Sequence, residues 1–118
     1  MQAITIFGNT GTTNVYRPAN AQGFIPLMLV LHGYGQGLQM YNNFYNAESL
    51  QQAALDQGFM FTVPLAGQYN EYHGSERCWE ATDGCCCGRS GNSSVNDLQG
   101  LIETIRSTTP TSSVLVHG

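Results

Sequence analysis

Hydrophobic residues in this chain gather in short runs, and the clearest run is Pro26-Leu27-Met28-Leu29-Val30-Leu31. It stops at His32-Gly33-Tyr34-Gly35. A continuous apolar run bounded by glycines is typical of a strand covered on both faces, as in parallel α/β sheets. A second run, Ser113 to His117, ends at Gly118. The pattern therefore predicts buried strands at 26–31 and 113–117.

The rest of the pattern predicts further strands and two helices. Weak alternation on either side of a Gly-containing turn favours a pair of antiparallel strands at the start of the chain. In chain order, the expected elements are strands at 2–7, 12–17 and 26–31, a helix at 44–57, a strand at 59–63, a helix at 95–106 and a strand at 113–117. Strands that alternate with helices imply parallel pairing and right-handed crossovers, so the expected class is α/β.

Both helices are predicted from apolar residues at helical spacing. In 44–57 these are Leu50, Ala53, Ala54 and Gln57, with Gly58 as the expected stop. In 95–106 they are Val95, Leu98, Leu101, Ile102 and Ile105, with Ser94 or Asn96 as the expected cap. The segment 65–92 between them is expected to be a long loop, and loops of that length are usually functional or tied by disulfides.

Composition narrows the classes of partner. The 118 residues carry 4 Lys+Arg against 8 Asp+Glu, a formal net charge of −4. This balance argues against a nucleic-acid or anionic-membrane surface, which needs a basic patch. No apolar run is long enough for a transmembrane helix. Residues 1–7 lack the features of a signal peptide, so either the mature protein begins here or an upstream segment is missing. A charged fraction of only 10% suggests a neutral polar surface, as in secreted proteins.

The cysteines form one cluster, Cys78, Cys85, Cys86 and Cys87. Adjacent cysteines rarely pair, so a bridge from Cys78 to one of the other three is favoured, and the remaining thiols could bridge elsewhere. The alternative is a metal site that includes His73. Structural zinc usually shows two separated Cys pairs, and here there is a single cluster. We therefore favour disulfides and expect no metal.

Three segments in this order carry a family resemblance. They are Pro26 to Gly35, the block Cys78-Trp79-Glu80-Ala81-Thr82-Asp83-Gly84-Cys85-Cys86, and Ser94-Val95-Asn96-Asp97-Leu98 with Leu101-Ile102. The chain resembles the N-terminal half of an α/β-hydrolase, in particular the secreted polyhydroxybutyrate-depolymerase-like and feruloyl/acetylxylan-esterase-like branch. The resemblance implies a partial domain over 1–118: an antiparallel start followed by βαβαβ, from a three-layer αβα sandwich.

The resemblance also implies where the chemistry lies. His32, Gly33, Tyr34 and Gly35 would form the oxyanion loop, with the main-chain N–H of Tyr34 as one donor. Gly118 matches the first glycine of the Gly-x-Ser-x-Gly nucleophile elbow. The family's catalytic Ser, Asp and His would all follow Gly118, so this chain is expected to be inactive alone.

Other polar residues are not expected to belong to the catalytic machinery. His32 is read as structural within the oxyanion loop, His117 as part of the last strand, and His73 as a solvated loop residue. Asp83 is expected to make loop hydrogen bonds, and Asp97 to favour a helix N-terminus.

Aromatic residues offer a candidate wall for an acyl group or sugar. The set comprises Tyr34, Tyr41, Tyr69, Tyr72 and Trp79. Tyr34 and Trp79 are the preferred substrate-binding candidates, and ordinary packing is the alternative for all five.

Together these features predict a fragment of a secreted, extracellular serine esterase that needs no cofactor. By resemblance its substrates are feruloyl or acetyl esters on polysaccharide, or polyhydroxyalkanoate esters. One alternative is a degenerate, non-catalytic half that binds carbohydrate or a protein partner through the aromatic loop. Another is a small Cys-clustered metal protein.

The family's strand order would place 113–117 beside 26–31, with its outer edge open along Val114, Leu115 and Val116. Such an apolar edge templates strand addition. Leu29, Leu31 and Val63 would lack part of their cover. The chain is therefore expected to self-associate.

Overall fold

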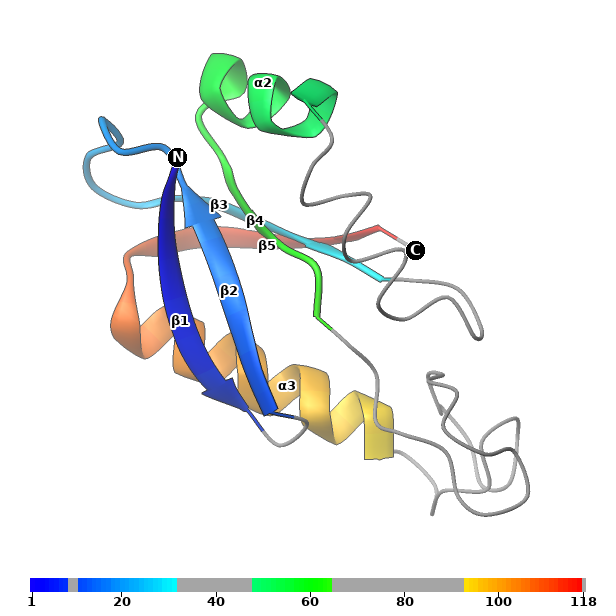
Figure 1. Cartoon of the computed structure of the whole chain (residues 1–118). Coiled ribbons are helices and arrows are strands. Elements are labelled where there is room, and N and C mark those ends of the chain that lie inside the picture. Colours follow the sequence, from blue (N-terminus) through cyan, green and yellow to red (C-terminus); the bar gives the residue numbers. More distant parts are fainter. Residues whose placement is uncertain (9–10, 32–47, 65–92, 118) are drawn as a thin grey trace.

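The computed structural model describes residues 1–8, 11–31, 48–64 and 93–117. Two helices and five strands lie in these ranges, in the order that the hydrophobic pattern predicts (Figure 1). They are β1 (Gln2–Gly8), β2 (Gly11–Arg17), β3 (Ile25–Val30), α2 (Glu48–Gln57), β4 (Met60–Thr62), α3 (Ser93–Thr108) and β5 (Thr111–His117). Among the described residues, no helix has the length and apolar character needed to cross a membrane.

The five strands form one mixed sheet in the order β1-β2-β4-β3-β5. β1 and β2 are antiparallel, as predicted, and β2 is antiparallel to β4. β3 lies in parallel between β4 and β5, with Leu29 opposite Thr62 on one side and Val116 on the other. The predicted α/β class is thus confirmed, and so is the expected placement of 113–117 beside 26–31.

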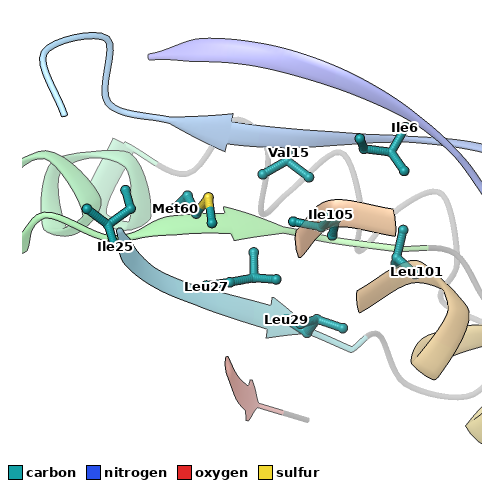
Figure 2. Packing of buried hydrophobic residues seen from close by; sticks show 8 residues of the cluster. All are labelled: Ile6, Val15, Ile25, Leu27, Leu29, Met60, Leu101 and Ile105. Atoms are coloured by element: carbon teal, nitrogen blue, oxygen red, sulfur yellow. The ribbon is translucent and has the colours of Figure 1, made fainter. Parts of the chain in front are cut away.

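One face of the sheet is covered by α3, which packs Leu101 and Ile105 onto the strands. Figure 2 shows the cluster that results from this packing. Its buried members are Ile6, Val15, Ile25, Leu27, Leu29, Met60, Leu101 and Ile105. They come from β1, β2, β3, β4 and α3, so this cluster joins the antiparallel start of the sheet to its parallel part.

The opposite face carries α2, which contributes the wholly buried Ala54 and the half-buried Leu50. Ala54 belongs to a second cluster with Tyr16, Val30, Phe61 and Val63. The rings of Tyr16 and Phe61 lie 5.2 Å apart between centroids. Figure 1 shows the sheet between the two helices, which gives the three-layer order that the resemblance implies.

Helix boundaries differ in part from the predicted ones. α2 ends at Gln57, and Gly58 follows with φ of 75°, a left-handed conformation that suits glycine. The N–H of Gly58 donates to the carbonyl of Ala54 at 2.9 Å, which caps the helix as predicted. Gln57 itself is exposed, so it adds nothing to the apolar stripe. The first residues of the predicted helix 44–57 lie outside the described ranges.

The expected caps of the second helix are wrong. α3 begins at Ser93 and continues to Thr108, so both Ser94 and Asn96 lie inside it. Asp97 is likewise its fifth residue and is half-buried, rather than at the helix N-terminus. The apolar residues did not mark the start, because a helix can extend beyond its apolar stripe.

The expected lack of cover over the sheet is also wrong for two of the three residues named. Leu29 and Val63 are both fully buried. Leu29 packs into the cluster beneath α3, and Val63 into the cluster that includes α2. Leu31 is half-buried.

A buried arginine, Arg17, forms hydrogen bonds with residues that precede β3 and β5 at the amino ends of these strands. The guanidinium of Arg17, at the end of β2, donates to the carbonyl of Gly23 at 2.7 Å and to that of Pro110 at 3.2 Å. It also donates to Oγ1 of Thr109 at 3.4 Å and contacts Sδ of Met60 at 3.7 Å. One side chain therefore links the turn before β3 to the connection between α3 and β5.

We predict that Arg17→Met lowers the free energy of unfolding by about 2 kcal/mol, because it removes the charge-assisted hydrogen bonds of a buried guanidinium and leaves the buried hydroxyl of Thr109 without this donor. Urea denaturation measures this as a lower midpoint with an unchanged slope. The control is Arg106→Met, since Arg106 is exposed in the last turn of α3; we expect it to change stability by less than about 1 kcal/mol. Equal effects of the two substitutions would contradict a clamp at Arg17.

Candidate functional site

The candidate site lies at the carboxyl ends of the three parallel strands, and this side of the sheet is called the carboxyl edge below. β3, β4 and β5 run in the same direction, so their carboxyl ends share this edge. The register pairs Val30 with His117 at its end. The main-chain N–H of Leu31 then donates to the carbonyl of His117 at 2.8 Å. The points at which the chain leaves β3 and β5 are therefore bonded to each other.

The connections that leave this edge diverge. After β3 the chain returns to β4 through α2, which covers one face of the sheet. After β4 it returns to β5 through α3, which covers the other face. In open α/β sheets a ligand binds outside the carboxyl ends of the strands, at the point where the strand order reverses. In the order β4-β3-β5 the chain runs from β3 to β4 and then back across β3 to β5, so that point lies between the carboxyl ends of β3 and β5.

The predicted site residues lie outside the described ranges. These are His32, Gly33, Tyr34 and Gly35 of the oxyanion loop, Trp79 of the aromatic set, the cysteines Cys78, Cys85, Cys86 and Cys87, and Gly118. Tyr41, Tyr69, Tyr72, His73 and Asp83 also lie outside them. The structure describes the strand ends that precede these segments. In the sequence, Leu31 directly precedes His32, and His117 directly precedes Gly118. Pro64 directly precedes the segment 65–92.

Two predicted residues are described. His117 is exposed at the end of β5, and Asp97 is half-buried in α3. Among the described residues, no group of His, Cys, Asp or Glu side chains is placed to hold a metal ion. Besides His117, the described residues at these strand ends are the apolar Val30, Leu31, Val63 and Pro64.

Sequence reasoning missed the direct link between the two strand ends. The hydrogen bond from Leu31 to His117 joins main-chain atoms of residues that are far apart in the chain. No side-chain pattern encodes such a bond. The only available signal was the predicted pairing of 26–31 with 113–117, which the sheet confirms.

A shallow hollow lies elsewhere, at the connection between α3 and β5. Its volume is about 290 Å³, and it is lined by Phe24, Arg106, Ser107, Thr108, Thr109 and Pro110. The hydroxyls of Ser107 and Thr108 already donate to the carbonyl of Thr104. The hollow lies at the amino end of β5, whereas the candidate site lies at the carboxyl ends of the parallel strands. The two are therefore separate.

Comparison with known proteins gives a likeness of structure but no match of sequence. No family model matches the sequence, and no curated protein matches it. Among solved structures, the chain is similar to XC6422 from Xanthomonas campestris, described as a member of the α/β serine hydrolases without a lid. The identity is 17% and the TM-score is 0.42. The alignment covers 98% of this chain and 48% of that one, so this chain spans about half of its length.

The hydrogen bond at the strand ends predicts a contrast in amide exchange. We expect the amide of Leu31 to exchange slowly, because it is bonded to His117 within the sheet. The amide of Gln22, an exposed residue in the connection between β2 and β3, is the comparison, and we expect it to exchange rapidly. Hydrogen exchange followed by NMR in dilute protein measures both. Equal, rapid exchange at the two amides would contradict the pairing of these strand ends.

Proposed function

We propose that this chain forms the first part of the catalytic domain of a serine carboxylic-ester hydrolase with an α/β-hydrolase fold. The hydrogen bond between Leu31 and His117 is the observation that carries the proposal. The segment that resembles an oxyanion loop begins one residue after Leu31, and the glycine that resembles the start of a nucleophile elbow follows His117. Both starting points therefore lie on neighbouring strands at one edge.

Ester hydrolysis through a serine requires this proximity. The serine oxygen attacks the ester carbonyl carbon and forms a tetrahedral intermediate, whose oxyanion accepts hydrogen bonds from main-chain N–H groups. One donor would be Tyr34, and the second would be the residue after the serine. Neighbouring strands lie about 4.8 Å apart, so loops that leave β3 and β5 can converge on one carbonyl group.

The proposed substrates are neutral esters of polysaccharides or polyesters. In the sequence, β3 is followed by the segment 32–47, which contains Tyr34, and β4 is followed by the segment 65–92, which contains Trp79. Aromatic side chains of this kind suit the flat, uncharged surface of a sugar ring or acyl chain. The low content of charged residues agrees with an uncharged substrate and a secreted parent protein. We further propose that Cys78 forms a disulfide with Cys85, Cys86 or Cys87, which would close the segment that carries Trp79.

The coding sequence after Gly118 tests the proposal. The 118 residues contain no Gly-x-Ser-x-Gly segment, so we predict that this chain alone does not hydrolyse p-nitrophenyl acetate.

We expect the coding sequence to continue as x-Ser-x-Gly after Gly118. Expressed with that continuation, the protein should hydrolyse the ester and react with a fluorophosphonate probe. Replacing the new serine by alanine should lower kcat by at least about 10⁴-fold. A continuation without that serine, or fluorophosphonate-sensitive turnover by the 118 residues alone, would contradict the proposal.

The role of Tyr34 is tested separately in the continued protein. Tyr34→Pro removes the main-chain N–H, whereas Tyr34→Phe keeps it, so only the first should remove an oxyanion donor. We predict that Tyr34→Pro lowers kcat by about 10²–10³-fold, while Tyr34→Phe leaves kcat within a few fold. A fall in kcat of the same size in both variants would assign the effect to the phenol ring or its hydroxyl and contradict the main-chain role.

A further inference from the structure

Phe24 is the most exposed large apolar side chain among the described residues, at 74%. It lies in the connection between β2 and β3 and lines the hollow at the amino end of β5, named the Phe24 hollow below. The rest of the lining comes from the end of α3 and the connection to β5, namely Arg106, Ser107, Thr108, Thr109 and Pro110. A single exposed ring is ordinary on a protein surface, so the groups around it decide whether it marks a site.

One buried side chain holds the two walls of the hollow together. The guanidinium of Arg17 donates to the carbonyl of Gly23, directly before Phe24, at 2.7 Å and to that of Pro110 at 3.2 Å. Gly23 has φ of 71°, a left-handed conformation that suits glycine. The main chain that carries Phe24 is therefore fixed against the end of α3 before any ligand binds. Such preorganisation lowers the entropic cost of binding.

The end of α3 supplies both hydrogen-bond donors and acceptors to the hollow. The exposed guanidinium of Arg106 supplies donors. The hydroxyls of Ser107 and Thr108 donate to the carbonyl of Thr104, so their oxygen atoms keep lone pairs that can accept. Pro110 has no N–H, so it cannot donate to the carbonyl of Arg106 as the fourth residue along a helix does. The hollow thus combines an aromatic ring with polar groups of both kinds.

This combination fits a neutral sugar ring better than an apolar or an anionic ligand. A pyranose ring presents C–H groups that can stack on Phe24, and its hydroxyls both donate and accept. An apolar ligand would cover the polar groups of the α3 end and leave them without partners. An anion could pair with Arg106, but it would face the negative end of the α3 dipole. The volume of about 290 Å³ lies at the lower end of small-molecule sites.

We propose that the Phe24 hollow is a second binding site, which holds one neutral sugar unit of a polysaccharide chain. The choice of a polysaccharide as the source of the sugar rests on the proposed function, in which polysaccharide esters are substrates. The hollow lies where the orange end of α3 leads into β5, and none of its lining residues belongs to β5 (Figure 1). The continuation proposed after Gly118 leaves from the other end of that strand. A polymer held at this second point would raise the effective concentration of its ester groups at the carboxyl edge.

Titration of the 118-residue chain with xylohexaose, followed by NMR of the main-chain amides in dilute protein, tests the proposal. We expect saturable shifts at Phe24, Arg106 and Ser107, with a Kd of about 1 mM because the hollow is shallow and one ring is stacked. Phe24→Ala should raise this Kd by about tenfold or more, because it removes the stacking surface, whereas Phe24→Trp should keep the binding. Arg106→Met should weaken binding by a few fold, because it removes hydrogen-bond donors.

The matched control removes an exposed apolar side chain elsewhere. Leu55 is 46% exposed on α2 and does not line the hollow, so Leu55→Ala should bind xylohexaose as the unsubstituted chain does. Because the side chain of Phe24 is largely in water, Phe24→Ala should leave the urea midpoint unchanged. That measurement separates a lost site from a lost fold.

Several results would overturn the proposal. They are no saturable binding at about tenfold above the expected Kd, shifts confined to residues outside the hollow, and an unchanged Kd in Phe24→Ala. Tighter binding of a 3-hydroxybutyrate trimer or of a galacturonic acid oligomer would overturn the assignment to a neutral sugar.

The binding test is independent of catalysis, because the 118 residues contain no Gly-x-Ser-x-Gly serine. Ester hydrolysis by the continued protein without xylohexaose binding would overturn the second site alone. Binding of xylohexaose to a protein whose continuation lacks the serine would overturn the proposed hydrolysis alone.

Discussion

The burial of β3 on both faces is the constraint on which the structure depends. Leu27 and Leu29 point to one face and Val30 to the other, and none of the three is more than 1% exposed. A strand of this kind is stable only when both faces are covered by other elements. α3 covers one face and α2 the other, and β4 and β5 take the two edges. Each surrounding element thus removes a separate part of β3 from water.

Because β3 is buried on both faces, the residues that pack the core and the residues that could react lie in different segments of the chain. Because β3 is apolar along its length, reactive groups must lie beyond its end rather than within it. Parallel pairing then brings the ends of β4 and β5 to the same edge, where Leu31 and His117 are hydrogen-bonded. A sheet built in this way supports many chemistries through its loops. The α/β class therefore follows from the strands, whereas the proposed ester hydrolysis depends on the segments that begin at His32 and Gly118.

Much of the fold could be predicted because local pattern decided it. The apolar run at 26–31 required a strand covered on both faces, and the glycine at position 58 marked the end of α2. Features that depend on long-range packing were missed. Nothing in the sequence indicates that Arg17 reaches the carbonyl of Pro110, because the partner is a main-chain group supplied by a distant turn. Of the site, the residues predicted the strands themselves, whereas the resemblance supplied both the pairing of 113–117 with 26–31, which the sheet confirms, and the roles of Tyr34 and Trp79.

The parallel order β4-β3-β5 is the central claim, and nuclear Overhauser effects between main-chain protons of the folded chain test it most directly. The account predicts that Leu29 shows cross-strand effects to Thr62 on one side and to Val116 on the other, each in the parallel pattern. Effects in an antiparallel pattern, or a β5 strand that pairs with β4 or β1 instead of β3, would contradict it. In that case the segments that follow Leu31 and His117 would not begin side by side.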